Sequence, residues 1–310
     1  MALLIQTNID FLGVRKLAMG LSIAMLVISI ASFFVRGMNL GLDFSGGTLI
    51  EAGYPEAVEL EEIRSLLAQE GYDEAVVQHF GTAKEVLIKV APRVELSSAQ
   101  LSSEILRSLR KANEEVDMRR VEYVGPQIGE ELREDGGLAL IFALIGILIY
   151  VALRFEYRFA LGSVAALIHD VIITLGFFSL FQLEFDLTVL AAVLAVIGYS
   201  LNDTIVVFDR IRENFRRMRK VGSFEVINAS LNQTLSRTLM TSATTLLVLL
   251  ALFFLGGELI HGFATALMIG VLIGTYSSIY VASSMIHAMG VSKADLMPVE
   301  KEGEDLDEIP

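Results

Sequence analysis

Long apolar runs, separated by short polar segments, dominate the residue pattern of this chain. Six of these runs approach or exceed the roughly 20 residues that a helix needs to cross a bilayer. They are Leu17–Val35, Leu138–Leu153 (extended by Gly136 and Gly137), Phe159–Phe181, Leu187–Phe208, Thr238–Leu255 and Gly262–His287. The pattern therefore predicts a polytopic α-helical membrane protein with six transmembrane helices, 1–36 holding the N-terminus and first span and 136–290 the other five.

The polar segment 37–135 is long enough to form a domain between the first two spans. Its pattern alternates between the periods of strands and helices. The predicted elements are a strand Thr48–Tyr54, a helix Glu56–Glu70, two strands Ala75–Phe80 and Glu85–Val90 around the turn Gly81-Thr82, a helix from Ser97 or Ser98 to Ala112, and a strand Asp117–Val124. This β-α-β-β-α-β order predicts an α+β, ferredoxin-like domain.

The positions of Lys and Arg predict the orientation of the spans. Arg15 and Lys16 precede the first span, and the segments 154–158 and 209–237 are also basic. The loops 182–186 and 256–261 contain acids but no Lys or Arg. Both termini are therefore expected in the cytoplasm, with the ferredoxin-like domain in the periplasm. The first run lacks a cleavage pattern after Arg36, which favours a retained anchor over a signal peptide.

The basic segment after the fourth span allows two interpretations. It either binds anionic lipid headgroups through a short interfacial helix, with Phe215, Met218 and Phe224 on its apolar side, or it only enforces topology. The C-terminal segment 291–310 is acidic and is expected to be a disordered cytoplasmic tail.

Composition narrows the functional classes. Hydrophobic residues make up 54% of the chain, there is no Cys, and the net charge is −13. Disulfides and thiolate metal sites are therefore excluded, and the acidic balance does not favour nucleic acid. His79, His261 and His287 show no metal-ligand spacing. No nucleophile–base pair or phosphate loop is evident, so we expect neither an enzyme nor a bound cofactor or metal.

Asp203 is the most informative residue, because it lies inside the fourth predicted span beside Asn202. Acids within a membrane are costly and usually serve ions, protons or an intramembrane partner. At 1.5 Å per residue, Asp203 lies about 24 Å from the outer end of its span, and Arg237 lies about 28 Å down the next one. The similar depth suggests an Asp203–Arg237 pair. This pair is either part of an ion or proton relay or a static link between two helices.

Asp170 is a second acid, located in the third span next to His169. Adjacent helical residues project about 100° apart, so the two side chains are not expected to face each other. Asp170 either joins the relay or makes a structural polar contact. Small and hydroxyl residues in the last two spans are expected to permit close helix packing or to line a hydrated path. They are Ser242, Thr244, Thr245, Gly270, Gly274, Thr275, Ser277 and Ser278.

Two glycine motifs flank the periplasmic domain. The first, GLDFSGGT, contains Gly41, Asp43, Gly46 and Gly47; the second, VGPQIGEEL, contains Gly125, Pro126 and Gly129. The first has no following Lys, no preceding strand and no following helix, which argues against a phosphate-binding loop. Taken separately, both motifs predict tight turns, the second as a rigid re-entry into the membrane.

Together with GYSLNDTIVVFDRIREN in the fourth span, these motifs resemble the SecD/SecF family of protein-export subunits. The resemblance runs from about Gly41 to about His287, and the size of the periplasmic loop favours the SecF branch. It implies membership of the resistance–nodulation–division superfamily and a location in the bacterial inner membrane. The family's intramembrane acid and arginine correspond to Asp203 and Arg237.

The resemblance also implies partners: SecD, the SecYEG channel, unfolded preprotein and membrane lipids. It implies that a proton or sodium gradient drives preprotein translocation, and the residues do not distinguish the two ions. Two other functions remain open. One is a small-molecule exporter of the same superfamily, and the other is a non-conducting scaffold in which Asp203 and Arg237 only join helices.

Overall fold

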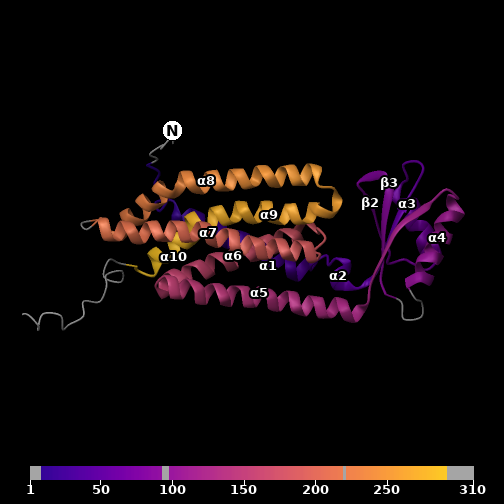
Figure 1. The fold of residues 1–310 in the computed structure, drawn as a ribbon, viewed down its shortest axis with the longest axis horizontal. Helices are drawn as coiled ribbons and strands as arrows, with labels where there is room; N and C mark the ends of the chain where they lie inside the picture. The colour runs from indigo at the N-terminus through magenta and orange to yellow at the C-terminus, as the bar shows by residue number, and fades with distance from the viewer. Residues whose placement is uncertain (1–7, 93–97, 219–220, 292–310) are drawn as a thin grey trace, which may run out of the picture.

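A computed structural model describes residues 8–92, 98–218 and 221–291. Within them, six helical segments are long and apolar enough to cross a membrane. These are α1 (Arg15–Arg36), α5 (Pro126–Arg154), α6 (Tyr157–Phe181), α7 (Leu187–Arg217), α8 (Ser223–Leu255) and a last segment made of α9 (Glu258–Ser277), the π-helix η1 (Ser278–Ala282) and α10 (Ser283–Ala288). The predicted six-span membrane fold is confirmed. The spans form an elongated bundle with a small domain at one end (Figure 1).

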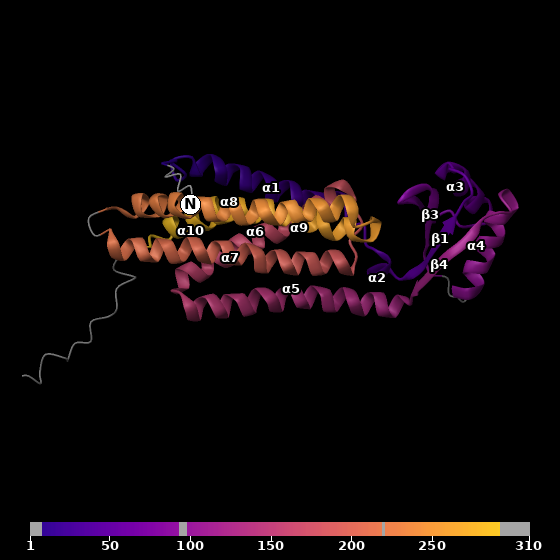
Figure 2. The same cartoon turned by 45° about the horizontal axis from the view of Figure 1, so that its top comes forward.

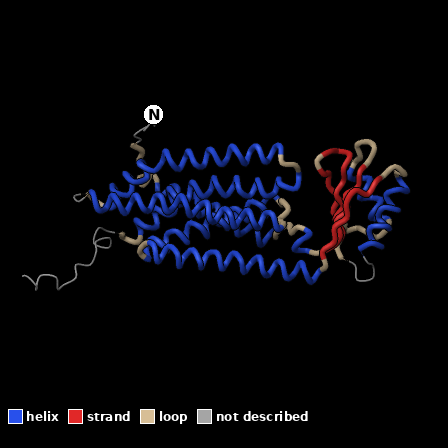
Figure 3. Tube along the Cα trace, in the orientation of Figure 1, coloured by secondary structure: helices blue, strands red, loops and turns tan. Residues whose placement is uncertain are grey.

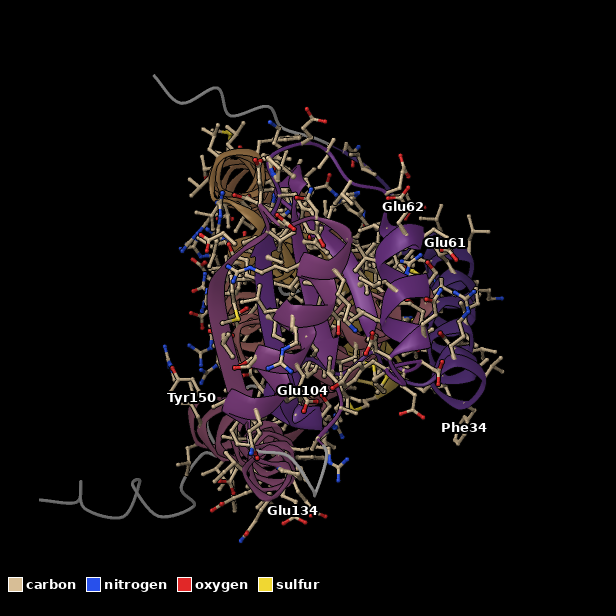
Figure 4. All side chains as sticks on the ribbon, turned by 90° about the vertical axis from the view of Figure 1, so that its right-hand side faces the viewer. Phe34, Glu61, Glu62, Glu104, Glu134 and Tyr150 are labelled. Carbon is tan, nitrogen blue, oxygen red and sulfur yellow. The ribbon has the colours of Figure 1, made fainter. Side chains whose placement is uncertain are left out.

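Helices α6 and α7 form the centre of the bundle, and α1 and α5 lie at opposite edges of it (Figure 2). Glycine allows close packing at the centre, since a Cβ at Gly176 of α6 would lie 2.2 Å from the Cβ of Ser29 on α1. The outer helices carry exposed apolar side chains such as Phe34 (88% exposed) and Leu255 (86%). Figure 4 shows Phe34 and Tyr150 pointing away from the bundle. Such a surface needs lipid or protein to cover it.

Three helices extend beyond the predicted apolar runs into the polar sequence next to them. Helix α5 begins at Pro126, and α8 begins at Ser223 rather than Thr238. Helix α7 continues to Arg217, so the predicted separate interfacial helix after the fourth span is wrong. The extension is held by packing: Asn214 is buried and donates to Ser230 (2.8 Å) and Gln233 (3.0 Å) of α8. Hydropathy marks only the membrane-crossing part of a helix, whereas backbone hydrogen bonding continues beyond it.

The small domain is an antiparallel four-stranded sheet with strand order β2-β3-β1-β4. Its elements are β1 (Gly47–Gly53), α3 (Leu60–Gln69), β2 (Val76–Phe80), β3 (Thr82–Val90), α4 (Ser98–Ala112) and β4 (Asp117–Val124). This is the predicted ferredoxin-like arrangement. The helix expected from Glu56 begins at Leu60, because the backbone before it still pairs with β3: Val58 donates to the carbonyl of Ala83 (3.1 Å).

Helices α3 and α4 cover one face of the sheet, and the opposite face is turned toward the bundle (Figures 1 and 3). The alternating residues Ile50, Val86 and Ile88 are fully buried against Leu67 and Ile105 of the helices. The outer side of the helices carries acids, and Figure 4 shows Glu61 and Glu62 pointing away from the domain. The predicted cap at Ser97 and the C-terminal tail lie outside the described residues.

Candidate functional site

Asp203 lies in the middle of α7 and is buried, with 7% of its surface exposed. Its Oδ1 accepts a hydrogen bond from Thr238 Oγ1 (2.7 Å) of α8, and its Oδ2 accepts one from Ser278 Oγ (2.6 Å) of η1. Both donors are neutral hydroxyls. A carboxyl group held this way between three helices is able to bind and release a cation without losing its position.

Arg237 does not form the expected contact with Asp203. Within the described residues, no ion pair shorter than 4.0 Å joins the two side chains, and Arg237 is exposed. The reason is helical geometry: consecutive residues project about 100° apart, and on α8 it is Thr238 that faces Asp203. The depth of a residue along the helix axis, on which the predicted pair rests, is independent of this rotation.

Arg237 instead lines an open cavity of about 830 Å³ between the ends of α5, α7 and α8. Asn202, the neighbour of Asp203 in the sequence, also lines it and is exposed to it. The remaining charged lining residues are Arg154, Asp209, Arg210, Arg212, Glu213, Arg216 and Arg217. Glu213 pairs with Arg210 (2.8 Å) and Arg217 (2.7 Å), which leaves the cavity strongly basic.

Asp170 and His169 form a second buried polar cluster on α6. Contrary to the expectation from the 100° rotation, His169 Nδ1 lies 2.9 Å from Asp170 Oδ1, because the flexible ends of the two side chains converge. Asp170 Oδ2 also accepts hydrogen bonds from Ser200 Oγ (2.5 Å) of α7 and Ser277 Oγ (2.7 Å) of α9. The cluster joins α6, α7 and α9.

The small residues of the last two spans permit close packing, as expected. A Cβ at Gly270 would lie 2.0 Å from a methyl group of Val196, and one at Gly274 would lie 3.0 Å from Ser200 Cβ. Ser242 and Thr275 share a hydrogen bond of 2.6 Å between α8 and α9. Thr244 is exposed and bonds only to its own helix.

The first glycine motif joins α1 to the N-terminal end of α7. The Gly41 amide donates to the carbonyl of Phe185 (2.8 Å), and Asp43 Oδ2 accepts from the amide of Leu187 (3.0 Å), the first residue of α7. Asp43 therefore satisfies one of the free amides at that helix end. Residues Leu42–Ser45 form a short helix, α2, within the motif, and the glycines at its end lead into the strand β1 rather than into a helix.

The two glycine motifs contact each other. A Cβ at Gly129 of α5 would lie 3.0 Å from the Gly46 amide nitrogen and 3.2 Å from the carbonyl oxygen of Phe44. Gly46 and Gly47 have φ values of +67° and +128°, which favour glycine. The second motif starts α5, with Gly125 as N-cap and Pro126 as the first helical residue. The motifs thus form one compact joint between domain and bundle.

This joint also contains a charged contact that the sequence pattern does not reveal. Lys89 Nζ of β3 lies 3.8 Å from Glu184 Oε1 in the loop before α7 and donates to the carbonyl of Leu40 (2.7 Å). Burial raises the pKa of Glu184 above its ordinary value of 4.5, with Lys89 opposing. Burial also lowers the pKa of Lys89, opposed by Glu184 and Asp43. No sequence motif marks this pair, because the two residues meet only through the fold.

No group of three or more potential metal ligands occurs in the described part of the chain. His261 stacks on Phe253 with ring centroids 4.6 Å apart, and His287 lies edge-on to Phe224 at 5.9 Å. His79 lies on β2 at the edge of the sheet.

Comparison with known families gives two matches. Residues 104–292 match the model described as protein export membrane protein SecD/SecF, C-terminal, and residues 31–54 match the SecD/SecF GG motif. Among relatives named protein translocase subunit SecF, the one from Vibrio alginolyticus is 53% identical over 98% of both chains. The one from Pseudomonas aeruginosa is 49% identical over 94% of both chains. The one from Escherichia coli O157:H7 is 46% identical over 96% of this chain and 93% of its own length.

The structure also resembles a solved one. The crystal structure of SecDF from Thermus thermophilus, described as a translocon-associated membrane protein, matches with a TM-score of 0.84 and 40% identity over 93% of this chain. A second structure, of SecDF in a super-membrane-facing form, matches with a TM-score of 0.71. The present chain covers 39% of the first SecDF chain and 40% of the second.

Proposed function

The chain belongs to the SecD/SecF family of protein export membrane proteins, and we propose that it is the SecF-type accessory subunit of the Sec machinery. It is a multi-pass membrane protein. In the proposed role it assembles with a SecD subunit and associates with the SecYEG channel in the bacterial inner membrane. Both termini then lie in the cytoplasm, and the ferredoxin-like domain lies in the periplasm. Unfolded preprotein is the proposed substrate.

The proposed driving force is a flow of protons or sodium ions through the site around Asp203. The observation that carries this proposal is a buried carboxylate whose hydrogen bonds, among the described residues, come from the hydroxyls of Thr238 and Ser278, while Arg237 acts on it only from beyond ion-pair distance. A static link would be expected to pair the acid with a cation, because an unpaired buried charge is costly. Neutral donors suit an acid that changes its charge, because they can stay hydrogen-bonded to it when it is ionised and when it is protonated or binds a cation.

The basic cavity supplies the proposed route between Asp203 and the cytoplasm. Arg237 and Asn202 line it, and Asn202 is adjacent to Asp203 in α7. Arg237 acts in this proposal as a mobile cation that approaches Asp203 when the acid is ionised and withdraws when the acid is occupied. Its long side chain and exposed position allow both arrangements.

The function is tested by reconstituting the full chain with SecD and SecYEG and varying the pH and sodium gradients independently. We expect translocation to accelerate with one gradient in the wild-type protein. Asp203→Asn should translocate at the rate seen without a gradient, since an amide does not titrate. The control Asp135→Asn removes an exposed acid from α5 and should respond as the wild type does. An Asp203→Asn protein that still responds to the gradient contradicts the proposal.

A further inference from the structure

The His169–Asp170 dyad is more deeply buried than Asp203. His169 is 4% exposed and Asp170 is 0% exposed. The carboxylate of Asp170 accepts from two serines and contacts the imidazole, so both of its oxygens are engaged. The proposed function does not use this dyad.

The charge that the dyad can hold depends on the groups that surround it. In the described residues no Lys or Arg forms an ion pair with His169 or Asp170. The titratable groups near it are Tyr276 of α9, whose ring stacks on His169 at 6.3 Å, Tyr280 of η1, which packs on Tyr276, and Asp203 beyond the serines.

The charged and titratable residues of the other packed helices lie at the helix ends. The charged ones are Arg15, Lys16 and Arg36 of α1, Glu130, Glu131, Arg133, Glu134, Asp135 and Arg154 of α5, and His287 of α10. Tyr150 of α5 is 53% exposed on the outside of the bundle. A dyad with neutral His169 and ionised Asp170 would place a bare negative charge inside the membrane, at high cost. One proton shared by the two residues removes that charge.

The second nitrogen of His169 has no partner. Nε2 is buried and makes no hydrogen bond within the described residues. A purely structural histidine would normally have both nitrogens satisfied, because an unpaired buried polar atom costs about 1–3 kcal/mol. Nε2 is therefore available to a further proton or a water molecule.

The dyad is connected to Asp203 through consecutive residues. Ser277 donates to Asp170 Oδ2 (2.7 Å), and the next residue, Ser278, donates to Asp203 Oδ2 (2.6 Å). A second connection runs along α7, where Ser200 contacts Asp170 three residues before Asp203. Ser278 is the first residue of the π-helix η1, and such irregular turns are frequent at functional sites.

We propose that the His169–Asp170 dyad is a second proton-binding site, coupled to Asp203 through Ser277 and Ser278. Uptake from hydronium forms one O–H or N–H bond in the dyad and releases water, with no electron transfer. A change of charge at one carboxyl group alters the hydrogen bond from its serine and, through the adjoining residue, the hydrogen bond to the other carboxyl. The inference rests on the proposed function for its purpose, but proton binding is measured without translocation.

Infrared difference spectra at stepwise pH, recorded on the full chain co-purified with SecD in lipid nanodiscs, test the proposal. We expect two carboxyl protonation steps within the membrane region. Asp170→Asn should remove one step, and Asp203→Asn the other. Because two interacting acids titrate as a pair, at least one of the two substitutions should shift the midpoint of the remaining step by about one unit or more.

Ser277→Ala tests the connection. It should reduce the mutual shift between the two steps. Ser284→Ala is the matched control, since Ser284 is a buried serine of the same span without a hydrogen-bond partner, and it should leave both steps unchanged. Thermal unfolding and SecD co-purification check that each variant folds. If Asp170→Asn does not fold, His169→Gln and Ser277→Ala carry the test.

A spectrum unaffected by Asp170→Asn and His169→Gln, or a Ser277→Ala spectrum identical to that of Ser284→Ala, overturns the proposal. Failure of this inference is distinguishable from failure of the proposed function. If only Asp203 titrates and Asp203→Asn abolishes gradient-driven export, the second site is wrong and the function stands. If both acids titrate but the export rate does not depend on any gradient, the second proton-binding site is supported and the proposed function is wrong.

Discussion

At the residue scale, the chemistry of this protein depends on which side chains surround two buried carboxyl groups. Asp203 and Asp170 each accept hydrogen bonds from two hydroxyl groups on neighbouring helices. Hydroxyls rotate and serve as donor or acceptor, so they accommodate both the charged and the neutral acid. Arg237 makes no ion pair with Asp203 within 4.0 Å, and its side chain lines the neighbouring cavity.

The first prediction concerns Asp203 and Arg237. Asp203→Asn and Arg237→Gln should each leave membrane levels and SecD co-purification unchanged, because no ion pair joins the two residues in the structure. Removing an exposed arginine is expected to cost less than about 1 kcal/mol of stability. The double variant should not regain gradient-driven export. Export rates and co-purification are measured side by side for all three variants.

A static link between the two helices predicts the opposite pattern. In that case each single substitution strands a buried charge and impairs assembly, and the double neutral replacement restores it. Wild-type export from the double variant would show that Asp203 carries no ion.

At the element scale, the joint between domain and bundle depends on close backbone contacts. Gly129 at the start of α5 packs on the turn at Gly46, and Asp43 satisfies an amide of α7. Three membrane helices and the first strand therefore meet within one short segment. The position of the small domain relative to the bundle is therefore set by these contacts.

The second prediction tests the contact between α5 and the Gly46 turn. Gly129→Ala should lower the free energy of unfolding by about 1–3 kcal/mol, because the added methyl group would lie 3.0 Å from the Gly46 nitrogen. Gly146→Ala on the same helix is the control. Its methyl group meets no atom within 4 Å, so the better helix propensity of Ala should raise stability slightly. Equal thermal stabilities of the two variants would contradict the prediction.

The third prediction concerns pH at the joint. Burial raises the pKa of Glu184, so above pH 4.5 the folded protein binds a proton there more readily than the unfolded chain does. Stability contributed by this group therefore increases as the pH falls from above the raised folded pKa toward 4.5. The thermal stability of the wild type relative to Glu184→Gln should increase over that window. A difference that is constant, or that decreases with acidification, is incompatible with the raised pKa.

At the scale of the whole molecule, six spans and a ferredoxin-like domain form one elongated body (Figure 1). The central helices α6 and α7 carry both buried acids, while α1, α5 and α8 present apolar side chains outward. The face of the sheet that α3 and α4 do not cover is turned toward the bundle (Figure 3). This arrangement places the two acids in the interior of the bundle and the domain at one of its ends.

The fourth prediction concerns topology. Reporters fused after Gly222 and after Pro310 should be active in the cytoplasm, and one inserted after Glu70 should be active in the periplasm. The basic segments 154–158 and 209–217 support this orientation through the positive-inside rule. A periplasmic signal from the fusion after Pro310 would mean that one of the six apolar helices does not cross the membrane.

The sequence by itself determined the features that depend on local pattern. The apolar runs specified six spans, because a helix in lipid must be apolar over about 20 residues. The alternation in 37–135 specified the strand and helix order of the domain. Asp203 was evident as a candidate because an acid in such a run is rare.

Only the tertiary structure decided which side chains meet. The rotation of α8 directs Thr238 rather than Arg237 toward Asp203, and the packing of α6 brings His169 against Asp170. Other contacts join segments that are far apart in the chain. They are the hydrogen bonds from Ser277 to Asp170 and from Ser278 to Asp203, and the Lys89–Glu184 contact. Periodicity gives the face of a helix but not the neighbour that packs on it, because that neighbour is selected by the packing of the whole bundle.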